Sequence, residues 1–168
     1  MWYVMQVQPR HEYEIAGWCR EFVAQPGEEI FVIQGARFYQ HNGVWERRLS
    51  IAFHGYVFAD TEEITDFKQR LRKIPAMTKL LGTGGAVVPV NEEEKELLLR
   101  LGGEEHVIEL SKGYRKNDRL IVTEGPMMGL EGLVKWSDRH KRIACLEIMI
   151  MGQPTEVRLG VEILRQVT

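Results

Sequence analysis

Residues 119–134 read RLIVTEGPMMGLEGLV, in which two short apolar segments flank a run of turn-forming residues. Beyond residue 103 the apolar pattern has a period of two, and no amphipathic helix is found. Further apolar segments follow at 143–151 and 156–161, separated by turn-forming residues such as Gly152-Gln153-Pro154. Several short strands within such a short stretch predict a small β-barrel at the C-terminal end of the chain.

The residues before 102 combine helical and strand patterns. Asn42-Gly43 predicts a hairpin turn, because both residues tolerate positive φ, and Asn91 followed by three glutamates predicts a helix start. Residues 60–63 resemble a capping box. The expected elements are strands at 2–7, 30–33 and 53–59, a hairpin at 38–48, helices at 10–24, 62–74 (ended by Pro75) and 91–101, and a loop at 82–85. The predicted fold class is α+β, with a linker at 102–111.

Charge and cysteine content narrow the function classes. Residues 1–103 carry 12 Lys+Arg and 14 Asp+Glu, whereas residues 104–168 carry 10 of each. A uniformly basic nucleic-acid binder is excluded, but local basic patches are not. Cys19 and Cys145 are far apart, which favours free thiols in a reducing cytosol. The N-terminus does not resemble a secretory signal and no apolar run is long enough to span a membrane, so a cytoplasmic location is expected.

Motifs for catalysis are not found in the sequence. The five histidines show no metal-ligand spacing, and neither a P-loop nor a nucleophile or dinucleotide motif occurs. The glycine-rich segment 82–85 could cradle a phosphate, but a plain surface turn is the simpler interpretation. We expect a protein that is not an enzyme and that has no metal or cofactor.

Basic residues gather in two segments of the second half. Residues 112–119 and 135–142 each contain four Lys or Arg and one acidic residue. Such side chains can neutralise phosphates, and Trp136 or His140 could stack on a base, although a solvated loop and a core tryptophan are equally compatible with the pattern. The candidate RNA-binding residues are Lys112, Arg115, Lys116, Lys135, Arg139, His140, Lys141 and Arg142.

The apolar segment FHGYVF at residues 53–58 is the second candidate site. Gly55 between two aromatic residues indicates a bend or a close backbone approach. The simplest interpretation places Phe53 and Tyr56 in the core. A period of two cannot turn every aromatic residue of this segment inward, however, so part of it is predicted to form a docking patch.

Several segments resemble one known family. Residues 2–7 (WYVMQV), 46–49 (ERRL) and 53–58 resemble the N-terminal domain of the NusG family of transcription elongation factors. Residues 119–134 are similar to the C-terminal KOW motif of that family, and residues 150–155 (IMGQPT) look like its strand-and-turn ending. The resemblance covers essentially the whole chain.

The resemblance implies a domain organisation. Residues 1–101 would form an α/β sandwich like the NusG N-terminal domain, which docks on the clamp helices of RNA polymerase and bridges the DNA cleft. Residues 102–111 would be a flexible linker, and residues 112–168 a KOW domain with an SH3-like barrel that recruits other partners.

The resemblance also assigns site residues. Phe53, His54 and Tyr56 fall where the family has its polymerase-facing patch. The loop at 82–85 falls near the point where the family approaches the far side of the cleft or the non-template DNA strand.

Departures from the family pattern indicate a specialised member. His54 replaces the usual proline, Met151 replaces an aromatic residue, and Arg158 and Gly160 replace acidic residues. Together with the basic segment 135–142, these changes make the chain similar to LoaP-type antiterminators, whose KOW domain binds a hairpin in nascent RNA. Arg158 therefore joins the candidate RNA-binding residues.

The main hypothesis is a monomeric transcription antitermination factor that binds RNA polymerase through its first domain and an RNA hairpin through its KOW domain. One alternative is a housekeeping NusG-type factor whose KOW domain recruits proteins. Another is a ribosome-associated KOW protein that binds RNA, which would leave the first domain unexplained. The β-branched residues and glycines of residues 104–168 predict that this part remains a β structure in the free protein.

Overall fold

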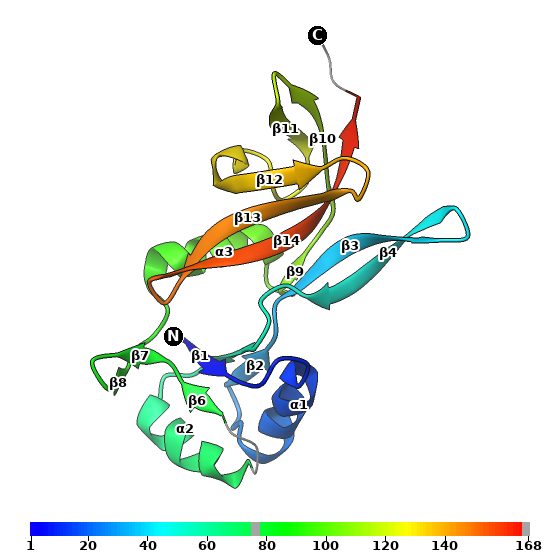
Figure 1. Ribbon diagram of the computed structural model, residues 1–168. Coiled ribbons are helices and arrows are strands. Elements are labelled where there is room, and N and C mark those ends of the chain that lie inside the picture. Colours follow the sequence, from blue (N-terminus) through cyan, green and yellow to red (C-terminus); the bar gives the residue numbers. More distant parts are fainter. Residues whose placement is uncertain (75–77, 166–168) are drawn as a thin grey trace.

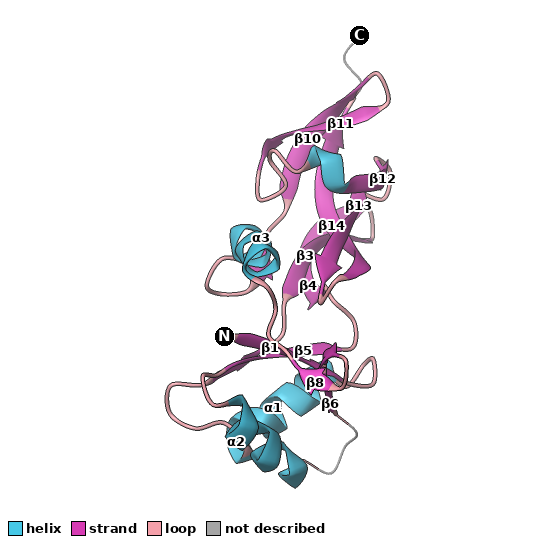
Figure 2. Cartoon of the chain, turned by 90° about the vertical axis from the view of Figure 1, so that its left-hand side faces the viewer, coloured by secondary structure: helices cyan, strands magenta, loops and turns pink. Residues whose placement is uncertain are grey.

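The computed structural model describes residues 1–74 and 78–165 and shows a mixed α+β chain. A four-stranded antiparallel sheet near the N-terminus has the order β2-β5-β1-β6, and helices α1 and α2 lie against one of its faces (Figures 1 and 2). The elements are β1 (Trp2–Gln6), α1 (Glu12–Phe22), β2 (Glu29–Phe31), β5 (Tyr56–Asp60), α2 (Ile64–Arg70), the 3-10 turn η1 (Leu71–Lys73) and β6 (Lys79–Leu80).

Both faces of this sheet are buried. Met5 of β1 packs with the helices, whereas its neighbour Val4 belongs to a second apolar cluster on the opposite face. Because successive side chains of a strand point to opposite faces, a strand covered on both sides is apolar throughout. This explains the unbroken apolar run at the start of the chain and confirms the predicted first strand.

The hairpin predicted from Asn42-Gly43 is confirmed. Strands β3 (Gln34–His41) and β4 (Val44–Ile51) pair antiparallel, and the two turn residues have φ of 51° and 79°. The hairpin projects from the body of the molecule (Figure 1). Its base is held by the short parallel strand β9 (Val107–Ile108), which lies inside the segment 102–111 that was predicted as a linker.

Helix α3 (Glu92–Gly102) begins as predicted at Asn91. The Asn91 side chain accepts a hydrogen bond from the backbone N–H of Glu94 at 2.8 Å. Such a cap satisfies one of the free N–H groups at a helix start, and the first-turn glutamates complement the positive helix end.

The C-terminal part forms a five-stranded sheet of order β11-β10-β14-β13-β12. Strand β10, which pairs with β11 and β14, was missed by the sequence analysis because polar residues dominate it. The elements are β10 (Ser111–Lys116), β11 (Arg119–Glu124), the 3-10 turn η2 (Glu131–Leu133), β12 (Val134–Asp138), β13 (Ile143–Ile150) and β14 (Gln153–Leu164).

Other predicted elements differ from the structure in detail. The segment 53–55 is a turn rather than part of a strand, and β5 starts at Tyr56. The expected capping box does not form: Glu63 is the N-cap residue of α2 without a side-chain bond, and Thr61 accepts the Glu63 N–H instead. Residues 82–87 form a small hairpin of β7 (Gly82–Thr83) and β8 (Ala86–Val87). Pro75, predicted to end the second helix, lies outside the described residues.

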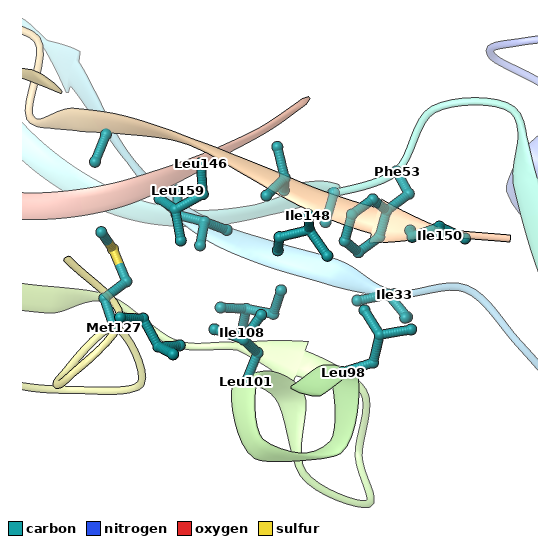
Figure 3. Packing of buried hydrophobic residues seen from close by; sticks show 14 of the residues in the cluster. Ile33, Phe53, Leu98, Leu101, Ile108, Met127, Leu146, Ile148, Ile150 and Leu159 are labelled. Carbon is teal, nitrogen blue, oxygen red and sulfur yellow. The ribbon is translucent and has the colours of Figure 1, made fainter. Parts of the chain in front are cut away.

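The N-terminal unit (residues 1–108) and the C-terminal unit (residues 111–165) share one apolar core. Figure 3 shows Phe53, Leu98 and Leu101 of the first unit directed toward Ile148 and Ile150 of the second, and all five belong to one buried cluster. The two units therefore pack against each other, in contrast to the flexible tether that the resemblance implied.

Polar and steric contacts reinforce this junction. The Glu94 carboxylate accepts the N–H groups of Met151 and Gly152, in the β13–β14 turn, at 3.0 and 3.1 Å. At the other end, Gly160 lies so close to β3 that a Cβ atom there would be 2.8 Å from the carbonyl oxygen of Ala36. The junction thus combines a capped turn with a tight strand crossing.

Candidate functional site

The turn at residues 53–55 is built around a buried carboxylate. Glu12, only 1% exposed, accepts the backbone N–H of Gly55 at 2.8 Å. The Gly55 carbonyl in turn accepts the N–H of Val7 at 2.8 Å. Gly55 has φ of +81°, which favours glycine, and a Cβ there would lie 3.1 Å from the Val7 carbonyl oxygen, a tight contact that favours glycine further.

The three residues predicted to bind polymerase differ in accessibility. Phe53 is 1% exposed and packs in the core shared with the C-terminal unit, Tyr56 is half-buried against the same cluster, and the His54 side chain is exposed. In this arrangement only His54 and part of Tyr56 can be reached by another protein. Phe53 is covered by the core that the two units share.

The β12–β13 loop is shaped by Asp138. Its carboxylate accepts the backbone N–H groups of Lys141 at 3.0 Å and His140 at 2.9 Å. These hydrogen bonds stabilise the charged carboxylate and hold the pKa of Asp138 below its ordinary value, and the bond from Lys141 has the largest effect. The one acidic residue of the basic segment therefore orders the loop.

Three side chains of this loop extend into solvent. Arg139, His140 and Lys141 are exposed, and none of the three forms an ion pair with another described residue. Strand β10 ends at the same end of the sheet, where the Arg115 guanidinium donates hydrogen bonds to the Ser137 carbonyl and, at 2.8 Å, to its hydroxyl. The two basic segments thus lie at one end of the C-terminal sheet.

Other candidate RNA-binding residues already have partners within the protein. Lys135 pairs with Glu156 at 2.9 Å and with Glu147 at 3.4 Å, and the hydrogen bond to Glu156 is the main reason that the pKa of Lys135 is raised. Arg115 is held by Ser137 as described above. Both side chains are therefore less available to an RNA ligand than those of the loop.

The remaining candidates differ in exposure and in their contacts. Lys112 is half-buried on β10 opposite Glu162 of β14, whereas Lys116 is exposed at the β10–β11 turn. Arg158 lies over the ring of Trp136 with its Cζ atom 5.3 Å from the centroid. Trp136 is 40% exposed, so it is a surface residue and the core interpretation of it is wrong.

Arg142 makes a contact that the sequence analysis did not foresee. Its guanidinium Cζ atom lies 4.4 Å from the ring centroid of Trp45 and 5.2 Å from that of Phe38, both on the β3–β4 hairpin of the N-terminal unit. A crevice of about 410 Å³ opens beside this contact. Its lining includes Trp45, Arg139, His140, Arg142, Glu162 and Arg165.

No sequence signal pointed to this crevice. The Asn42-Gly43 turn predicted the hairpin that carries Trp45, but no local pattern indicates that the hairpin lies next to a loop almost 100 residues later. A second, smaller crevice brings together a candidate polymerase-binding residue, His54, and a candidate RNA-binding residue, Arg158. Arg37 and Glu156 also line it.

The β7–β8 turn borders a further hollow. This hollow, of about 530 Å³, is lined by three cationic side chains of the N-terminal unit, Lys68, Arg72 and Lys79, and by Gly82 and Gly85 of the small hairpin. It lies at the segment that the resemblance placed near DNA.

Possible metal ligands and thiols are dispersed or buried in the described part of the chain. Within residues 1–74 and 78–165, no group of three or more His, Cys, Asp or Glu side chains is placed to hold a metal ion. Cys19 and Cys145 are free and buried, and burial raises the pKa of the Cys19 thiol to about 11. None of the helices in the described part of the chain has the length and apolar character needed to cross a bilayer.

Comparison with known proteins identifies the family. The family model described as transcription termination factor NusG matches residues 1–99. A transcription termination/antitermination protein NusG of Campylobacter jejuni is 23% identical over 166 residues, covering 94% of this chain and 92% of that protein. A protein of the same description from Halalkalibacterium halodurans is 26% identical over 110 residues, covering 64% of this chain and 62% of that protein. The chain therefore belongs to the NusG family of transcription factors.

Proposed function

We propose that this chain is a transcription antitermination factor that binds RNA polymerase through its N-terminal unit and a hairpin of nascent RNA through its C-terminal unit, which we take to be a KOW domain. The β12–β13 loop is the observation that carries the proposal. Asp138 orders the loop backbone while Arg139, His140 and Lys141 extend into solvent. Cationic side chains on an ordered backbone suit the phosphates of a structured RNA.

Polymerase binding is proposed for the turn at 53–56. His54 is exposed beside the half-buried Tyr56, and Glu12 holds the turn rigid through the Gly55 N–H. An aromatic side chain on a rigid turn can be buried in a protein interface at low entropic cost. Contact with Phe53 would additionally require the C-terminal unit to separate, since the shared core now covers this residue.

A DNA contact is proposed for the hollow beside the β7–β8 turn. Lys68, Arg72 and Lys79 supply three positive charges around it, and the turn glycines leave the backbone open to close approach. This arrangement supports a contact with the phosphate backbone of a non-template strand, without base-specific recognition.

One observation favours a second candidate function, a factor whose C-terminal unit recruits a protein. The charge of Lys135 is balanced by Glu147 and Glu156, and Met149 on the same strand as Glu147 is 45% exposed. A surface with balanced charge and an exposed apolar side chain suits a protein partner better than a phosphate backbone.

Selection from a library of hairpin RNAs with randomised loops tests the proposal directly. We expect the purified full chain to enrich a family of hairpins, with an affinity that falls steeply as salt is raised. Co-purification with RNA polymerase is measured in parallel from cells that express the chain with an affinity tag. Polymerase binding without any enriched RNA would favour the protein-recruiting function, and loss of both would contradict the proposal as a whole.

A further inference from the structure

The crevice between the β3–β4 hairpin and the β12–β13 loop is built by both units. Trp45 comes from the N-terminal unit, whereas Arg139, His140, Arg142 and Arg165 come from the C-terminal unit. Its volume of about 410 Å³ lies within the range of ~300–1,000 Å³ found for small-ligand sites. The crevice is open to solvent and large enough to receive part of a ligand between walls from both units.

Aromatic neighbours position the Arg142 guanidinium without using its hydrogen-bond donors. It lies over Trp45 at 4.4 Å and near Phe38 at 5.2 Å, while these two rings meet edge to face at 6.3 Å. A guanidinium that stacks on an aromatic ring keeps its N–H donors free, because they point outward in its own plane. Among the described residues, no hydrogen-bond acceptor is found for the Arg142 side chain within bonding distance.

The charge of the crevice favours an anionic ligand. Three arginines, Arg139, Arg142 and Arg165, face one carboxylate, that of Glu162, which leaves a formal excess of positive charge. Arginines combined with a half-buried tryptophan match the two parts of a nucleotide, since the base can stack and the phosphate can accept hydrogen bonds.

We propose that this crevice binds one unpaired nucleotide of an RNA ligand, with its base against the Trp45–Arg142 stack and its phosphate near Arg139 and Arg165. This inference rests on the RNA binding proposed above and adds that a residue of the N-terminal unit takes part in it. RNA bound in this way also holds the two units together, because its contacts come from both.

The test uses the hairpin pool enriched by the full chain and compares four variants. Trp45→Leu removes the stacking surface without changing charge, and Trp45→Phe keeps an aromatic ring. Arg142→Lys keeps the charge but loses the planar group. Tyr39→Leu is the matched control, because Tyr39 and Arg48 form a similar cation–aromatic pair at 5.3 Å on the opposite face of the same hairpin.

We expect Trp45→Leu to weaken binding by about 5- to 150-fold, the range of one base–aromatic stack. Its dependence on salt should stay as in the natural chain, since every phosphate contact is retained. Arg142→Lys should weaken binding with the same unchanged salt dependence, whereas Trp45→Phe should retain most of the affinity and Tyr39→Leu all of it. Thermal melting checks that each variant is folded. If Trp45→Leu does not fold, the RNA affinity of Arg142→Lys tests the proposed nucleotide site in its place.

Two results would overturn the inference, in distinguishable ways. Full affinity in folded Trp45→Leu and in Arg142→Lys, combined with weaker binding by Lys141→Ala, a loop residue that does not line the crevice, would exclude nucleotide binding in the crevice and leave the proposed function intact. Absence of RNA binding by the natural chain would remove both.

Discussion

Replacement of Gly160 by alanine is expected to strain the junction between the two units. A Cβ atom at this position would lie 2.5 Å from the Leu110 Cδ2 atom, 2.8 Å from the Ala36 carbonyl oxygen and 3.0 Å from the Arg37 Cα atom. Two of these three neighbours are backbone atoms of β3, so they cannot move aside by changing rotamer. Overpacking of this kind typically costs about 1–3 kcal/mol, because β3 must shift away from β14 to make room for the added carbon.

Gly132→Ala is the matched control, because no heavy atom lies within 4 Å of the added carbon and the change should stay within about 0.5 kcal/mol. Nitrogen-15 relaxation would show whether the units tumble together, and urea unfolding would give the free energy of unfolding. We expect joint tumbling for the natural chain, the control and Gly160→Ala, with a loss of about 1–3 kcal/mol in the free energy of unfolding for Gly160→Ala alone. An unchanged free energy of unfolding for Gly160→Ala would refute the tight strand crossing, and separate tumbling of the two units in the natural chain would refute the shared core.

Three further predictions concern the proposed contacts and the pH dependence of stability. Replacing Arg139 and Lys141 together with alanine should flatten the slope of log affinity against log salt by about 0.7–0.9 for each phosphate that the protein no longer neutralises, as measured by RNA titration at several salt concentrations; an unchanged slope would exclude both residues from RNA binding. Tyr56→Ala should weaken co-purification with RNA polymerase while the melting temperature shows that the chain remains folded, and undiminished co-purification would contradict the proposed docking turn. The hydrogen bonds from Arg70 are the main reason that the pKa of Glu28 is lowered to about 2. Because this folded-state pKa lies below the unfolded value near 4.5, the contribution to stability is present above about pH 4.5 and is lost as pH falls toward 2. Glu28→Gln should therefore reduce the acid sensitivity of urea unfolding, and an identical pH profile would rule out this pair as its source.

Features with local causes could be predicted from the sequence. The turn at Asn42-Gly43 follows from the φ preferences of two adjacent residues, and the start of α3 follows from a side-chain bond between Asn91 and a residue three positions later. Each signal lies within a few residues, so the turn and the helix start form independently of contacts with distant parts of the chain. Strand β10 gave no such signal, because its place in the sheet depends on pairing with β14, about 50 residues away.

The candidate sites were predicted less completely for the same reason. The basic residues of the β12–β13 loop could be found by composition, but whether each is free depends on distant partners, such as Glu156 for Lys135. The position of Trp45 beside Arg142 likewise requires that the hairpin and the loop meet. Charge density in a sequence segment therefore indicates a surface, but not which of its side chains remain available.

By itself, the sequence determined the α+β class, the order of most elements, the resemblance to the NusG family and the two basic segments. Only the tertiary structure decided that the units pack together, that Phe53 is covered and that one crevice has walls from both units. The physical reason is that local patterns record backbone preferences and the apolar face of each element. Which two apolar faces meet is settled by burial and shape complementarity between residues far apart in the chain, and no single stretch of sequence contains that information.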